Sequence, residues 1–180
     1  MSLLNGISNT IVAVFLILLT QNKVLEIINY QFTTASIYIS FMLGNVLGST
    51  ILVRKFTKTP TIFLLKLCEF LSIFVLLAII LAQIIIVIVI LFFYGVLSGI
   101  ISAKVFAEFI LNIPTKLVGS FMGLIETISI SLAPILTFVF NTLIIIYHNN
   151  ISIIALLILT IITLLHSLLF LKNMPNKTLS

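Results

Sequence analysis

Long apolar runs separated by short polar breaks dominate the pattern along this chain. Six such runs can be read, at residues 3–20, 32–53, 62–82, 84–107, 117–146 and 151–171. A helix needs about 20 apolar residues to cross the hydrocarbon core of a bilayer, and each run is near or above this length. The pattern predicts an all-α integral membrane bundle of six transmembrane helices, forming a single domain over residues 1–180.

The runs fit helices better than the strands of a membrane barrel. Barrel strands alternate between lipid-facing and interior-facing residues, whereas residues 84–90 are all isoleucine or valine. The stretch 61–103 is almost wholly apolar and too long for one helix, so it must fold back on itself. Its one polar interruption is Ala82-Gln83. A tight turn is therefore predicted at these two residues.

The basic residues predict the orientation of the bundle. The loop after the second run carries Arg54, Lys55 and Lys58. Five other basic residues fall on the same side of the six-run topology: Lys66, Lys104, Lys116, Lys172 and Lys177. Only Lys23 falls on the opposite side. Because positive charge is retained in the cytoplasm, both termini and the even-numbered loops, which include this basic loop, are expected to be cytoplasmic. The expected location is a plasma membrane.

The composition supports a membrane protein and excludes several other classes. The chain is 62% hydrophobic and 7% charged, and its mean hydropathy is +1.41. A soluble domain cannot bury so much apolar surface, so the lipid bilayer is the expected partner. The net charge of +5 does not indicate nucleic-acid binding, because the basic residues flank the runs. No metal site, cofactor site or catalytic cluster is predicted, so the chain is not expected to be an enzyme.

Small residues predict which helix faces pack closely. Six of the seven glycines form three G-x-x-x-G pairs, which are Gly44/Gly48, Gly95/Gly99 and Gly119/Gly123. Residues four apart share a helix face, and glycine there lets two backbones approach closely in lipid. Close packing is expected, and it is compatible with faces that slide between moving helices. Pro134 interrupts the fifth run and is expected to kink it.

Two carboxylates lie inside runs and are candidates for coupling to protons. Glu126 is near the middle of the fifth run, and no basic residue lies within four positions of it. It is a candidate for proton or substrate coupling, with a structural hydrogen bond as the alternative. Glu69 is the second candidate, although Lys66 three residues before it favours a structural pair. At the end of the fourth run, Lys104 and Glu108 have the spacing of a surface ion pair.

Two stretches carry a resemblance to a known family. Residues 41–55 read Phe-Met-Leu-Gly-Asn-Val-Leu-Gly-Ser-Thr-Ile-Leu-Val-Arg-Lys. This stretch resembles the second helix of a half-domain of the major facilitator superfamily, running into its basic loop. Residues 95–102 and 113–123 resemble that family's junction between the fourth and fifth helices. The chain is similar to the C-terminal half of a drug-efflux facilitator of the macrolide-exporter branch, but it has no aspartate before its loop arginine.

The resemblance implies a transporter that needs a partner. The family has twelve helices in two halves, with the substrate path between them. Six runs correspond to one half, so a second copy, a separate chain or a preceding segment would complete the path. The implied function is proton-coupled efflux of a small molecule. The alternative is a non-transporting membrane protein, such as an immunity or tolerance factor, an assembly partner or an inactive gene fragment, which the scarcity of polar residues in the runs favours.

Overall fold

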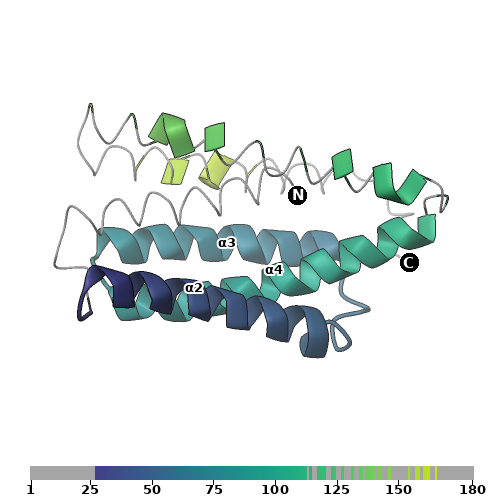
Figure 1. Ribbon diagram of the computed structural model, residues 1–180, viewed down its shortest axis with the longest axis horizontal. Coiled ribbons are helices and arrows are strands. Elements are labelled where there is room, and N and C mark those ends of the chain that lie inside the picture. Colours follow the sequence, from purple (N-terminus) through teal and green to yellow (C-terminus); the bar gives the residue numbers. More distant parts are fainter. Residues whose placement is uncertain are drawn as a thin grey trace.

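A computed structural model describes residues 27–112 of the chain and scattered positions beyond them. The latter are 114, 117–120, 123–124, 127, 131, 134–135, 137–140, 142, 146, 154, 157–158, 160–162 and 165. This part of the chain is mostly helical and contains no strand. Its elements are α2 (Tyr30–Leu47), the π-helical turn η2 (Gly48–Leu52), α3 (Thr61–Ile80) and α4 (Ile84–Asn112), and Figure 1 shows their arrangement.

Three helices in the described part are long and apolar enough to cross a membrane. They are Tyr30–Leu52, which joins α2 to η2, Thr61–Ile80 and Ile84–Asn112. The helical character predicted from the apolar runs is thereby confirmed, and three of the runs form helices with the length and composition of membrane spans. The predicted run at 3–20 and most of the runs at 117–146 and 151–171 lie outside the described residues.

Hydrogen bonds from short polar side chains begin α2. The Asn29 carboxamide oxygen accepts from the Phe32 N–H at 2.8 Å. The Thr33 hydroxyl donates to the Asn29 carbonyl at 2.9 Å and accepts from the Ile27 N–H, also at 2.9 Å. The first N–H groups of a helix have no partner within the helix, so these side chains supply acceptors that the apolar sequence around them lacks.

The reversal between α3 and α4 is a compact helix cap. The Ala82 N–H donates to the Ile79 carbonyl and the Gln83 N–H to the Ala78 carbonyl, both at 3.0 Å. This double pattern is the Schellman motif, whose central residue adopts a left-handed conformation. Ala82 takes that place with φ 54°. The chain therefore turns at Ala82-Gln83, the polar interruption noted in the sequence.

α4 extends past the fourth apolar run by more than one helical turn. The run ends at residue 107, whereas α4 continues to Asn112. The Asn112 amide donates to the Glu108 carbonyl at 2.8 Å, within the last turn. Charged residues in the final turns do not end a helix that has left the hydrocarbon core, whereas Pro114 disfavours helical conformation in the residue before it.

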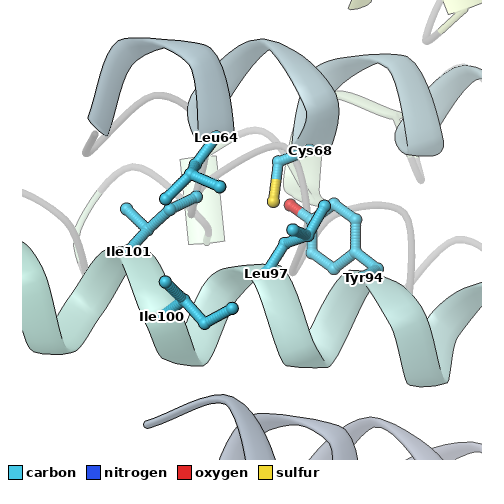
Figure 2. Close-up of a cluster of buried hydrophobic side chains, with 6 residues drawn as sticks. All are labelled: Leu64, Cys68, Tyr94, Leu97, Ile100 and Ile101. Carbon is cyan, nitrogen blue, oxygen red and sulfur yellow. The ribbon is translucent and has the colours of Figure 1, made fainter. Parts of the chain in front are cut away.

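α4 packs against both other helices, and the two contacts differ in the size of their side chains. Its contact with α3 is filled by large apolar groups. Figure 2 shows Leu64 and Cys68 from α3 facing Tyr94, Leu97 and Ile101 from α4; these residues and Ile100 of α4 form one buried cluster. Dispersion contacts between such side chains drive helix association where lipid removes the hydrophobic effect. The contact with α2 has the opposite character.

Candidate functional site

The glycines of α2 bring its backbone against the backbone of α4. A Cβ built on Gly44 would lie 2.2 Å from the Phe92 carbonyl oxygen. A Cβ built on Gly48 would lie 2.1 Å from the Val96 carbonyl oxygen. Both distances are too short for any carbon atom, and the atoms met are backbone atoms that cannot rotate away. Only glycine fits at these two positions.

The glycines of α4 meet α2 in the same way. A Cβ on Gly95 would lie 2.3 Å from the Phe41 carbonyl oxygen, and one on Gly99 would lie 2.2 Å from the Asn45 carbonyl oxygen. Two of the three G-x-x-x-G pairs therefore face each other across one contact. Backbones this close exchange extensive van der Waals and Cα–H to carbonyl contacts, which are the main attraction available between helices in lipid.

Ser40 extends this contact by one turn. Its hydroxyl donates to the Ile88 carbonyl of α4 at 2.9 Å. Ser40 precedes Gly44 by four residues and so lies on the same helix face. The α2–α4 contact is thus a stripe of small residues that includes a hydrogen bond between the helices, and glycine leaves no side chain to interlock at its four positions.

A lysine of α4 holds the loop between η2 and α3. The Lys104 ammonium donates to the carbonyls of Phe56 and Thr57, each at 3.1 Å, and to that of Thr59. The predicted ion pair with Glu108 is therefore wrong. Loop carbonyls that have no N–H partner within a helix lie within reach of Lys104, and an ammonium group satisfies three of them at once.

Glu108 also binds across to the start of α3. Its carboxylate accepts from the Thr61 hydroxyl at 3.1 Å. Lys104 and Glu108 are one turn apart on α4, and both reach the segment of residues 53–61. The cytoplasmic end of α4, in the predicted orientation, is thereby tied to the loop through groups of both charge signs.

The three cations of the loop remain exposed. Arg54, Lys55 and Lys58 all have exposed side chains, whereas Phe56 between them is half-buried and packs on the cluster of α3 and α4 side chains. The predicted basic loop is thus a folded segment. Phe56 attaches it to the α3–α4 cluster, Lys104 of α4 binds its carbonyls, and its three cations are exposed.

The structure describes only one of the two candidates for proton coupling. Glu69 is half-buried on α3. Glu126 lies outside the described residues, so its surroundings and its coupling role stay predictions. The pairing of Glu69 with Lys66 also stays a prediction.

The third glycine pair and the proline differ from the first two pairs. Gly119 and Gly123 are exposed and helical, and a Cβ on either would have no heavy atom within 4 Å. Close packing of a helix on this pair stays a prediction. Pro134 is exposed and in helical conformation, and the kink expected there stays a prediction.

One candidate polar group was missed by the sequence analysis. The hydroxyl oxygen of Thr34 is buried and has no hydrogen-bond partner among the described residues. Neighbouring Ser36 shows the ordinary alternative, since its hydroxyl donates to the Phe32 carbonyl at 2.8 Å. A threonine in an apolar run gives no sequence signal that separates these two states. An unpaired hydroxyl inside a bundle can bind a water molecule or a ligand.

The comparisons with known proteins found no similar protein. No protein-family model matches the chain, and neither a curated protein nor a solved structure matches it.

Proposed function

We propose that this chain is one half of a membrane transporter, a six-span facilitator-type half-domain that exports a small molecule in exchange for protons. One observation carries the proposal. The two stretches that resemble a facilitator half-domain, residues 41–55 and 95–102, pack against each other through Gly44/Gly48 and Gly95/Gly99. Segments of α2 and α4 that are far apart in the sequence thus form one unit, as parts of a common half-domain would.

The nature of this contact suits a moving bundle. Large interlocked side chains must leave their rotamers before two helices can shift, whereas glycine faces present smooth backbone surfaces. The α3–α4 contact, with Leu64 and Ile100 fully interior, forms the stiffer part. We expect α2 and α4 to adjust against each other while α3 and α4 move as one body.

A facilitator-type path requires a second half, which is a second copy or a separate chain. The outer face of α2 is apolar and exposed, at Ile39, Met42, Leu43 and Val46. Native mass spectrometry of the gently extracted chain tests this requirement. A complex near twice the 20.0 kDa mass of the chain, or one with another membrane protein of similar size, supports the proposal; a lone monomer contradicts it.

Glu126 is the residue proposed to couple efflux to protons. Glu126→Gln removes the titrating group with little change in shape, so pH-driven efflux of a fluorescent cationic dye should be lost while the protein stays in the membrane. Glu69→Gln is the matched control and should retain efflux, because Glu69 is proposed to be structural. Undiminished efflux in Glu126→Gln would remove the coupling role.

A non-transporting membrane protein is the second candidate, and the use of hydroxyl groups in the described helices favours it. Ser40 donates to a carbonyl of α4, and Ser72 donates to the Cys68 carbonyl at 3.1 Å. These two hydroxyl groups are satisfied inside the bundle, so neither is free to line a substrate path. If cells expressing the chain accumulate the dye as control cells do, this second candidate replaces the first.

A further inference from the structure

The loop of residues 53–60 has a defined shape that its own backbone maintains. The Lys55 N–H donates to the Leu52 carbonyl at 2.9 Å, and the Thr59 N–H donates to the Phe56 carbonyl at 3.1 Å. The half-buried ring of Phe56 packs on the α3–α4 cluster. These contacts make the loop a folded connection and not a free linker between two spans.

Lys104 binds the carbonyl oxygens of this loop on the side that faces the bundle. The carbonyls of Phe56, Thr57 and Thr59 all accept from its ammonium, so their negative ends face the bundle. Backbone carbonyls that point outward would partly neutralise nearby cations. With the carbonyls turned inward and compensated, the outer surface of the loop is left to its cationic side chains.

Three cations occupy that outer surface within five residues. Arg54, Lys55 and Lys58 are exposed. Glu108 of α4 accepts from the Thr61 hydroxyl, at the end of the same segment. The loop therefore carries three exposed cations beside this one carboxylate, and their excess positive charge can attract an anion from outside the bundle.

The position of the loop indicates which kind of anion it would meet. The loop joins two membrane-spanning helices, ending one at Leu52 and beginning the next at Thr61, so it lies at the level of the lipid headgroups. Anionic lipids attract juxtamembrane basic residues there, and guanidinium and ammonium groups bind phosphate oxygens through charge-assisted hydrogen bonds.

We propose that the loop of residues 53–60 is a built binding site for the phosphodiester headgroup of an anionic lipid. Arg54, Lys55 and Lys58 bind the headgroup, and Lys104 is a positioning residue that holds the loop in shape from behind. This site does not depend on transport, because it needs only the described bundle and a membrane.

Lipid titration of the purified full-length chain, followed by native mass spectrometry, tests the site. The delipidated protein is titrated in detergent with phosphatidylglycerol or with phosphatidylcholine of the same chain length. We expect phosphatidylglycerol to bind about tenfold more tightly. The variant Arg54→Gln/Lys55→Gln/Lys58→Gln should lose this preference. An equal affinity of the unaltered chain for the two lipids would overturn the proposal.

Charge-matched variants separate a built site from net charge. Lys116→Gln/Lys172→Gln/Lys177→Gln removes three positive charges elsewhere and should keep the preference; an equal loss in this control would overturn the site.

The positioning role of Lys104 has its own comparison. Lys104→Met leaves the three loop cations in place but should reduce the preference about threefold, and Lys104→Arg should restore it. Lys177→Gln, which also loses one charge, should have no effect. If Lys104→Met binds lipid as Lys177→Gln does, the positioning role is wrong. If Lys104→Met does not fold, the triple loop variant at exposed positions still decides the site.

A soluble anion is the remaining source of phosphate. Inorganic phosphate in large excess should not displace phosphatidylglycerol, because the acyl chains also hold the lipid against the apolar surface of the helices. Complete displacement would overturn the assignment to a lipid.

Discussion

Single residues in this bundle act mainly by what they allow the backbone to do. Glycine at four positions lets two helices touch, and a serine hydroxyl adds one hydrogen bond between them. In lipid no water is present to hydrogen-bond an unpaired polar group, and no hydrophobic effect drives helices together. Close packing of helices therefore depends on small residues that let the backbones approach. Thr34 departs from this pattern because its buried hydroxyl is unpaired.

Replacing Thr34 tests whether its hydroxyl is unpaired in the membrane. Thr34→Val keeps the shape and removes the oxygen, so the free energy of unfolding should rise by about 1 kcal/mol. Reversible denaturation in mixed micelles measures this difference. A loss of stability would show that the hydroxyl has a partner in the bilayer, such as water or a bound molecule.

Gly44 and Gly119 form a matched pair of substitutions. Gly44→Ala places a Cβ 2.2 Å from the Phe92 carbonyl oxygen, so α2 and α4 must separate, and the free energy of unfolding should fall by about 2 kcal/mol. Gly119→Ala meets no heavy atom within 4 Å and should be neutral or stabilising, because alanine is the better helix former. Equal effects of the two would contradict the α2–α4 contact.

The contrast between these glycines shows what the sequence can predict about single residues. All three pairs have the same spacing, and spacing predicts that two glycines share a face. It does not tell which other helix lies opposite that face. Gly44/Gly48 and Gly95/Gly99 oppose each other because both lie at matching depths of neighbouring helices, which is a property of the assembled bundle.

The elements are defined by how their ends are satisfied. Asn29 caps α2, Ala82 closes α3, and Lys104 of α4 binds the carbonyls that follow η2. The turn at Ala82-Gln83 could be predicted because a stretch too long for one helix must reverse, and these residues interrupt it near its middle. The partners of Lys104 and Glu108 could not, because their spacing is the same whether they pair with each other or bind a loop brought close by folding.

The turn between α3 and α4 contains a strain that can be removed. Ala82 has φ 54°, a conformation that glycine adopts without the clash of a Cβ. Ala82→Gly should raise the free energy of unfolding by about 0.5 kcal/mol, even after the greater freedom of glycine in the unfolded chain is counted. Ala78→Gly, within α3, is the control and should lower it by about 1 kcal/mol. Destabilisation by both changes would mean that Ala82 is unstrained.

The whole molecule, as far as it is described, is organised around α4. α2 contacts it through backbone and α3 through large side chains. Figure 1 shows α2 and α3 lying along α4, and Figure 2 shows side chains between α3 and α4. The loop of residues 53–60 and the turn at 81–83 stand at opposite ends of α3, whose 20 residues span about 30 Å. A spanning α3 would therefore place these two segments on opposite sides of the membrane.

Cysteine labelling can test this topology with little background. Cys68 is the only cysteine of the chain and is buried, so the unaltered protein should not react with a membrane-impermeant maleimide. In a Cys68→Ala background, Gln83→Cys should react on intact cells, and Lys58→Cys only after permeabilisation. The reverse pattern would invert the orientation, and labelling of both from one side would contradict a spanning α3.

The close contact of α2 with α4 also bears on the order of events during synthesis. Ser40 and Ile88 are 48 residues apart, and α3 lies between them in the chain. At translation rates of about 5–20 residues per second, α2 enters the bilayer several seconds before its partner exists. During that interval its glycine face is open to lipid or to other nascent helices. Correct assembly is therefore expected to require that this face be covered until α4 has been inserted. The membrane-insertion machinery is in a position to cover it.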